Sequence, residues 1–264
     1  MVLRRSPIWP DAITKPVAGA ARIDYGHPLT AAIKPEVVVL FRGSLGVQDL
    51  QKSQFGVLQG NPTHVILPFL ESAFGGDGTG DAVEFAGRPT AASTSDVTLM
   101  VLAVTTSLTT DRVALATSAA TNAGFRLQHD ANSLVFAKGN VADVDSGILL
   151  TANVPYALLI SHLAGSTVNW VVRRMDTGSI STATQSHSSA PQAGDGIYAI
   201  GGARVFSSNM WLGQIGMAVI GTGFVPMGML IAWSRDPYAF LRPVIRRRWF
   251  VPAAADTLFA QAMY

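Results

Sequence analysis

The chain has 264 residues, no cysteine and a formal net charge of +2 at pH 7. Hydrophobic residues make up 48% of it and charged residues only 14%, whereas an ordinary soluble domain is about 25% charged. The missing cysteines exclude disulfides, cysteine metal sites and thiol nucleophiles, and the small net charge gives no basis for nucleic-acid binding. With so few charges, part of the surface is expected to be covered by partners. A polar face built from Ser, Thr, Asn and Gln is a compatible alternative.

The two ends of the chain differ from its middle. Residues 1–30 contain four prolines and show no periodic pattern, and residues 239–264 carry Pro243 and Pro252 around an arginine run. We interpret both as extended arms that become ordered by packing on neighbouring proteins. Between them, residues 31–238 carry the strand signals and are expected to form one domain.

Neither a signal peptide nor a membrane span is predicted. The basic start of the chain is followed by prolines and charges at 6–16 rather than by an apolar core. The most apolar stretch, 211–233, is interrupted by several glycines and Pro226, which favours a buried strand, a turn and a short helix over a span of about 20 apolar residues.

Short strands separated by turn residues follow one another through the middle of the chain. The segment 97–107 is long and mostly apolar, which predicts a central strand buried on both faces. The segments 156–163 and 167–174 predict a hairpin around Gly165, and 226–234 is the one convincing helix because it begins with proline. The other predicted strands are 37–41, 82–85, 125–130, 134–137, 178–186, 196–201 and 211–220.

Several motifs in this order resemble those of the concanavalin A-like lectin/laminin-G family. A strand at 36–41 precedes Gln48-Asp49-Leu50, the segment 80–87 is similar to the family's G-x-A-x-x-F-x-G, and the segment 211–215 is similar to its F-x-G-x-I. The turn at 165–168, the pair Ile200-Gly201 and the final Asp236-Pro237 follow the same order. The resemblance covers about residues 36–237. It implies an all-β, two-sheet antiparallel jelly-roll sandwich.

The flanks carry a second resemblance. The segments 19–29 and 236–243, the latter followed by three arginines, are similar to the leader and the exit of phage-encoded proteins that carry this sandwich. They imply a structural protein of a tailed-bacteriophage virion, such as a capsid decoration, head-fibre, collar or tail component, assembled in the host cytoplasm. The expected partners are capsid, portal, collar or tail subunits and further copies of the chain. The alternative is a carbohydrate-binding adhesin on the virion surface, whose partner would be a host glycan.

The residues for catalysis are missing from the expected positions. Glycosidases need two carboxylates that face one cleft, but the chain has only three glutamates, and the spacing of Asp81 and Glu84 places them on opposite faces of a strand. The segment 75–80 is rich in glycine yet lacks the Lys-Ser/Thr of a phosphate-binding loop, so we expect a mobile loop between strands. We therefore predict no enzymatic activity.

No cofactor is predicted, and calcium is the one metal that the residues leave open. Asp77, Asp96, Asp143 and Asp145 are candidate ligands, although the Asp143-Asp145 segment lacks the remaining ligands of a calcium loop and a solvated β-turn is the alternative. The five histidines show no zinc-ligand spacing.

The arms supply the candidate partner-binding residues. Arginine can make bidentate contacts with carboxylates, and tryptophan is a frequent interface anchor; a solvated basic tail is the alternative. Trp170, at an interior-facing strand position, is expected in the core instead. The candidate residues in the arms are Arg4, Arg5, Trp9, Arg242, Arg246, Arg247, Arg248, Trp249 and Phe250.

Overall fold

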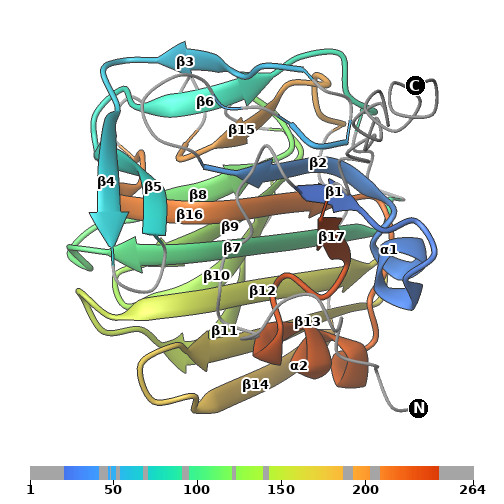
Figure 1. Ribbon diagram of the computed structural model, residues 1–264. Helices are drawn as coiled ribbons and strands as arrows, with labels where there is room; N and C mark the ends of the chain where they lie inside the picture. Colours follow the sequence, from blue (N-terminus) through green and yellow to red (C-terminus); the bar gives the residue numbers. More distant parts are fainter. Residues whose placement is uncertain are drawn as a thin grey trace, which may run out of the picture.

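The fold is taken from a computed structural model. The structure describes residues 21–41, 47, 49–51, 54–67, 71–90, 95–120, 123–138, 143–186, 193–202 and 209–243. These residues form two large antiparallel sheets packed face to face, together with a two-stranded ribbon and two helices on the outside (Figure 1). The predicted antiparallel β-sandwich is confirmed.

The first sheet, called the front sheet below, has the hydrogen-bonded order β14-β13-β12-β7-β16-β5-β4, and β2 also pairs with β16. Its strands are β2 (Pro35–Leu40), β4 (Thr63–Leu67), β5 (Glu71–Asp77), β7 (Val97–Thr105), β12 (Pro155–Leu163), β13 (Thr167–Arg174), β14 (Ile180–Ser186) and β16 (Leu212–Gly221). The predicted hairpin is the β12–β13 pair, with Leu163 opposite Thr167.

The second sheet, called the back sheet below, has the order β11-β10-β9-β8-β15-β6-β3. Its strands are β3 (Val57–Gln59), β6 (Ala82–Phe85), β8 (Arg112–Ala116), β9 (Phe125–Asp130), β10 (Ser133–Lys138), β11 (Val144–Leu149) and β15 (Tyr198–Ile200). In β9 the residues Phe125, Leu127 and His129 alternate with more polar ones, as expected for a strand with one face toward the core.

The main core lies between the two sheets. It is lined by alternate residues of each strand, among them Leu99 and Val101 of β7 and Phe125 of β9. Trp170 is fully buried there, as predicted. His162 is also in this core, where its ring lies 5.0 Å from the ring of Phe125 and close to Phe136.

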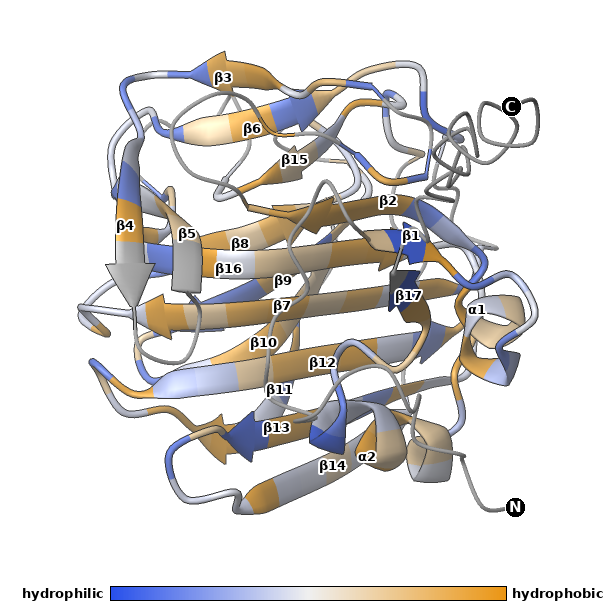
Figure 2. Cartoon of the chain, in the orientation of Figure 1, coloured by the Kyte–Doolittle hydropathy of each residue, from blue (hydrophilic) through white to orange (hydrophobic). Residues whose placement is uncertain are grey.

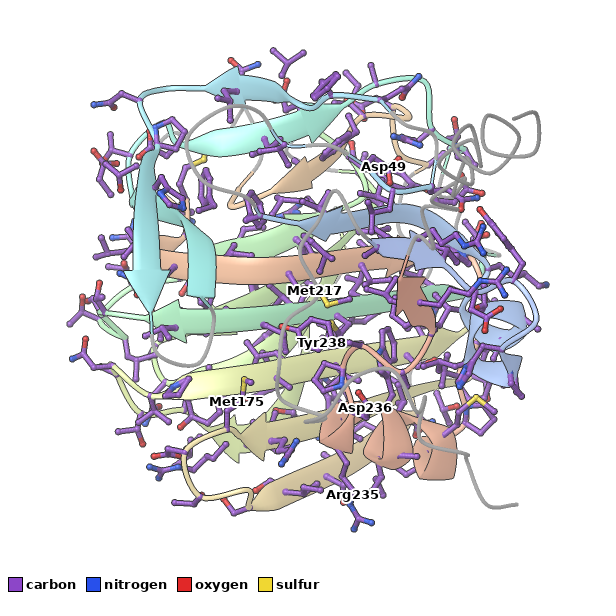
Figure 3. All side chains as sticks on the ribbon, in the orientation of Figure 1. Asp49, Met175, Met217, Arg235, Asp236 and Tyr238 are labelled. Carbon is purple, nitrogen blue, oxygen red and sulfur yellow. The ribbon has the colours of Figure 1, made fainter. Side chains whose placement is uncertain are left out.

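A second apolar layer covers the outer face of the front sheet. The residues of β7 that point away from the main core, Met100 and Leu102, are fully buried. They pack under β1 (Ala21–Ile23), α1 (Pro28–Ile33), α2 (Met227–Arg235) and β17 (Leu241–Pro243). Figure 2 shows hydrophobic residues along the central strands of this sheet, and Figure 3 shows Met217 and Tyr238 on this side of it. The central strand is thus buried on both faces, as predicted.

The described parts of the arms are not irregular, and here the prediction is wrong. β1 pairs with β17 in antiparallel register, with Ala21 opposite Pro243 and Ile23 opposite Leu241. Ala21, Ile23, Phe240 and Leu241 are buried. Strands of three residues are too short to show a period in the sequence, which is why inspection of the pattern missed them.

A second helix, α1, also begins inside the expected N-terminal arm. Its backbone is capped by His27, whose Nδ1 accepts a hydrogen bond from the amide of Leu29, and Pro28 occupies the first turn. With only six residues, the helix shows less than two turns of apolar periodicity. Its burial against the front sheet, through Leu29 and Ile33, accounts for its presence.

The glycine-rich segment also differs from the prediction. Gly75, Gly76 and Asp77 belong to β5, and only residues 78–80 form the turn toward β6. Gly75 pairs with Thr63 on one side and with Gln214 on the other. A strand built on glycines lacks the side-chain alternation by which strands are recognised, so β5 could not be seen in the sequence.

A buried ion pair joins the two loops that flank β2 and β6. The guanidinium of Arg88 lies 2.6 Å from the carboxylate of Asp49, and both side chains are fully buried. Asp49 also accepts a hydrogen bond from the amide of Val38 in β2, and Arg88 donates a second one to the carbonyl of Glu36. Figure 3 shows Asp49 beside β2. Each charge is therefore neutralised and held by backbone groups of the same strand.

We expect Arg88→Met to lower the free energy of unfolding by about 3–5 kcal/mol, because it leaves a buried carboxylate without its counter-charge. Adding Asp49→Asn should restore part of the loss, because asparagine keeps the acceptor for Val38 but carries no charge. Urea unfolding of the wild type, both single variants and the double variant measures this. A double variant that is less stable than Arg88→Met would contradict the assignment.

Candidate functional site

Only one of the predicted partner-binding residues lies in the described part of the chain. Arg242 is in β17, where its guanidinium lies 3.3 Å from the carboxylate of Asp24 and its cross-strand partner is Arg22. The structure thus joins Arg242 to the N-terminal part of the same chain. The other eight candidates, Arg4, Arg5, Trp9, Arg246, Arg247, Arg248, Trp249 and Phe250, lie outside the described residues.

A polar pocket lies where β4, β5 and the start of β16 meet; it is called the Gly75 pocket below. Its volume is about 190 Å³, and its polar lining comes from Asn61, Thr63, Asp77, Asp81 and Gln214. Val65 adds one apolar side chain. Of these residues only Asp77 was a candidate from the sequence, as a calcium ligand; the site as a whole was not predicted, because β4 and β5 were not.

A glycine in β5 lets two side chains of the pocket lining pack close to the backbone. In the strand register Thr63, Gly75 and Gln214 form one row across β4, β5 and β16, so their side chains point to the same face of the sheet. The middle position is a glycine, and the side chains of Thr63 and Val65 lie over it. A Cβ atom there would lie 2.5 Å from Thr63 Oγ1 and 2.9 Å from Val65 Cγ2, so a larger residue would have to displace these two side chains, which line the pocket.

The two carboxylates of the pocket, Asp81 and Asp77, differ in burial and in hydrogen bonding. Asp81 is buried, and its two oxygens accept hydrogen bonds from the amides of Asn61 and Asp77 at 2.8 and 3.0 Å. It therefore holds the loop before β4 against the end of β5. Asp77 is exposed, and one of its oxygens accepts from the amide of Thr79 at 2.7 Å. The pocket thus offers an accessible carboxylate next to side-chain amides and a hydroxyl.

A second surface pocket, called the Tyr25 pocket below, lies beside α1 and the start of β2. Its volume is about 280 Å³, and its lining includes Tyr25, Lys34, Glu36 and Gln51. The exposed phenol of Tyr25 donates a hydrogen bond to Gln51 Oε1 at 2.6 Å. This pocket is close to the β1–β17 ribbon, because only four residues separate β1 from α1.

The two pockets lie at opposite ends of the front sheet. Gly213 at the start of β16 lines the Gly75 pocket, whereas Gly223, just beyond the other end of β16, bonds through its amide to the carbonyl of Ile33 in α1. Nine residues of extended chain span roughly 30 Å. Figure 1 shows β4 and β5 at the left of the molecule and α1 at the right. The Gly75 pocket is therefore far from the point where both terminal segments join the sandwich.

The aspartates considered as calcium ligands serve separate turns where their contacts are described. Asp96 accepts a hydrogen bond from the amide of Ala164 in the β12–β13 turn, and Asp145 accepts from Gly147 and from the hydroxyl of Ser133. Asp77 is in the Gly75 pocket. Within the described ranges, no three His, Asp or Glu side chains are grouped so that they could hold a metal ion. Glu84 is buried in β6 and accepts a hydrogen bond from Gln59.

Another cluster of carboxylates was not recognised in the sequence. Asp111 precedes β8 and adjoins Asp130 at the end of β9, because Arg112 pairs with His129. Partial burial, a hydrogen bond with Asp130 and the negative charges of Asp130 and Asp143 raise the pKa of Asp111 to about 6. The carboxyl group of Asp111 therefore holds its proton more tightly in the folded protein than in the unfolded chain.

The raised pKa of Asp111 makes the free energy of unfolding depend on pH. Since the folded-state pKa of Asp111 is raised, stability from this group is present below pH 4 and is lost as the pH rises through about 6. We expect Asp111→Asn to raise the Tm at pH 7.5 by roughly 2 °C and to change it little at pH 4, which thermal melts at both pH values measure.

Asp176→Asn is the matched control. The pKa of Asp176 is lowered by its hydrogen bond from Arg174, so its loss should destabilise at neutral pH. A gain from Asp111→Asn that is equal at both pH values would contradict a raised pKa as the cause.

No described helix is long and apolar enough to cross a membrane.

No family model and no curated protein matches the chain. Solved structures do. The binding domain of paraclostridial mosquitocidal protein 1 is similar with a TM-score of 0.58 at 10% identity, over 78% of this chain and 52% of that one. The botulinum neurotoxin serotype D ligand-binding domain in complex with N-acetylneuraminic acid has a TM-score of 0.54 at 9% identity, over 76% and 50%.

A phage protein is also similar. The enzymatically active domain of bacteriophage CBA120 tailspike protein 2 has a TM-score of 0.51 at 12% identity, over 72% of this chain and 31% of that one. The chain thus spans about half the length of the toxin domains and less of the tailspike. At such identities the similarity defines only the fold: an antiparallel β-sandwich of the kind found in binding domains of toxins and in a phage tailspike.

Proposed function

We propose that the protein is a non-enzymatic attachment module on the surface of a tailed-bacteriophage virion, where it binds carbohydrate. The observation that carries this proposal is the Gly75 pocket, an open polar cavity at the end of the sandwich far from both terminal segments. The toxin binding domains with the same fold support a binding role, and the tailspike domain with the same fold supports a place in a phage particle. The resemblance of the flanking segments to phage-encoded proteins supports a location on the virion.

A purely structural role in the capsid, collar or tail is the second candidate. The feature that favours it is the β1–β17 ribbon, which brings both terminal segments to one point of the sandwich. Ala21 begins β1 and Pro243 ends β17, and the two are register partners. The described part of the chain therefore begins and ends at adjacent positions, as an anchor shared by two terminal segments would require. The two candidate functions are compatible, because an adhesin must also be held in its particle.

The anchor can be tested by truncation. We expect deletion of residues 244–264 to leave the circular dichroism spectrum and Tm of the sandwich unchanged and to abolish incorporation into the particle, because the arginines and aromatic residues of the C-terminal arm are removed. Normal occupancy of the truncated protein in purified particles would contradict the anchor.

The deletion must begin after Pro243, so that β17 remains intact. A deletion that begins at Ala239 also removes Phe240 and Leu241, which are buried under the front sheet and pack against Trp233. Loss of a buried phenylalanine side chain alone costs about 3–5 kcal/mol. The longer deletion should therefore lower the Tm strongly, and it serves as the control that separates loss of folding from loss of anchoring.

We expect no hydrolysis of host polysaccharides by the purified full-length chain, because Glu84 is buried and Asp81 is bound to two backbone amides, so neither faces substrate as a pair of catalytic carboxylates must. Release of reducing ends measures this. Release that disappears on Glu84→Gln would refute the non-enzymatic assignment.

A further inference from the structure

We propose that the Gly75 pocket selects a neutral, hydroxyl-rich sugar unit and rejects acidic ones such as N-acetylneuraminic acid. This inference rests on the proposed carbohydrate-binding function and names the class of sugar that the site takes. It follows from the size, the polar groups and the charge of the pocket.

The size of the pocket limits the ligand to about one ring. A volume of about 190 Å³ lies below the range of roughly 300–1,000 Å³ that is typical of pockets for drug-sized molecules. The pocket is open on one side, because Asn61, Thr63 and Asp77 at its rim are exposed. Such a cavity suits the terminal unit of a longer chain whose remainder stays in solvent.

The polar groups of the pocket match a polyol. Asn61 and Gln214 each carry a side-chain carbonyl and an amino group, so each can accept from one hydroxyl and donate to another. Asp77 keeps one carboxylate oxygen besides the one bonded to Thr79, and a carboxylate accepts hydroxyl protons in short charge-assisted bonds. Val65 offers an apolar contact to the carbon-bound hydrogens of a ring.

The charge of the pocket decides between neutral and acidic sugars. Its lining includes two carboxylates, Asp77 and Asp81, and none of the described lining residues is a lysine, arginine or histidine. A sugar carboxylate brought there would find no cation among the lining residues and would be repelled by Asp77. A neutral sugar avoids this cost.

A bound metal ion is the less suitable occupant. Calcium takes six to eight oxygen ligands, whereas both oxygens of Asp81 are already used by the amides of Asn61 and Asp77. Only Asp77 offers a free carboxylate oxygen to the cavity. Sugar binding at this site should therefore not require calcium and should persist in EDTA.

The experiment uses the full-length chain and two sets of probes: methyl glycosides of neutral hexoses, and N-acetylneuraminic acid with sialylated oligosaccharides. Binding is measured by titration calorimetry and by ligand-observed NMR. We expect the wild type to bind at least one neutral hexoside and none of the acidic probes.

Three substitutions test the location. Asp77→Asn keeps the oxygen that bonds Thr79 but removes the charge; it should weaken neutral-sugar binding at least tenfold. Gln214→Ala removes one amide without touching the glycines and should have a similar effect. Gly75→Val would displace the side chains of Thr63 and Val65, which line the pocket, and should abolish binding. Asp176→Asn, an exposed aspartate elsewhere on the surface, is the matched control and should bind as the wild type does.

The outcomes are distinct. If the wild type binds none of the probes, the carbohydrate-binding function itself is wrong. If it binds sugar but Asp77→Asn and Gln214→Ala bind equally well, the function stands and the pocket is wrong. Preference for sialylated probes, or loss of binding in EDTA, overturns the class of ligand. Because Gln214→Ala and Asp77→Asn leave the backbone as it is, a misfolded Gly75→Val variant would not affect these conclusions.

Discussion

The front sheet is apolar on both faces, and the rest of the structure follows from that constraint. One face of β7 is buried against the back sheet, and the other, with Met100 and Leu102, would expose a large hydrophobic surface if nothing covered it. Burial of apolar area is the dominant favourable contribution to folding. The chain therefore returns over this face with β1, α1, α2 and β17, which makes a three-layered body from a two-sheet fold. The low charge content, which suggested coverage by partners, is explained in part by this internal layer.

How much of this could be predicted from the sequence depends on the length and composition of each element. The long strands β7, β12, β13 and β16 carry enough apolar or alternating residues to be recognised, and their order identified the sandwich. The strands β1 and β17 have three residues each, and β5 is interrupted by Gly75 and Gly76. Such segments are strands because of their neighbours rather than because of their own side chains, so no local pattern could reveal them.

The candidate site was beyond prediction for the same reason. The sequence drew attention to the charged and aromatic arms, whose residues are conspicuous. The Gly75 pocket lies instead at the row formed by Thr63, Gly75 and Gln214, and a row across three strands exists only once their register is known. Likewise Arg88 drew no attention as a single arginine, although its pairing with Asp49 is fully buried. Contacts between residues 39 positions apart are not visible in a linear pattern.

The antiparallel ribbon of β1 and β17 has a mechanical consequence. Because Ala21 and Pro243 are register partners, a pull that separates the two terminal segments would open the ribbon one hydrogen bond at a time, which is a weak geometry. A pull between the ribbon and the far end, where β4 and β5 lie, instead runs along the length of β16 and its neighbours (Figure 1), so it does not open the ribbon from one end. A molecule held by both terminal segments together and pulled at the opposite end would therefore be loaded along its long strands rather than across the ribbon.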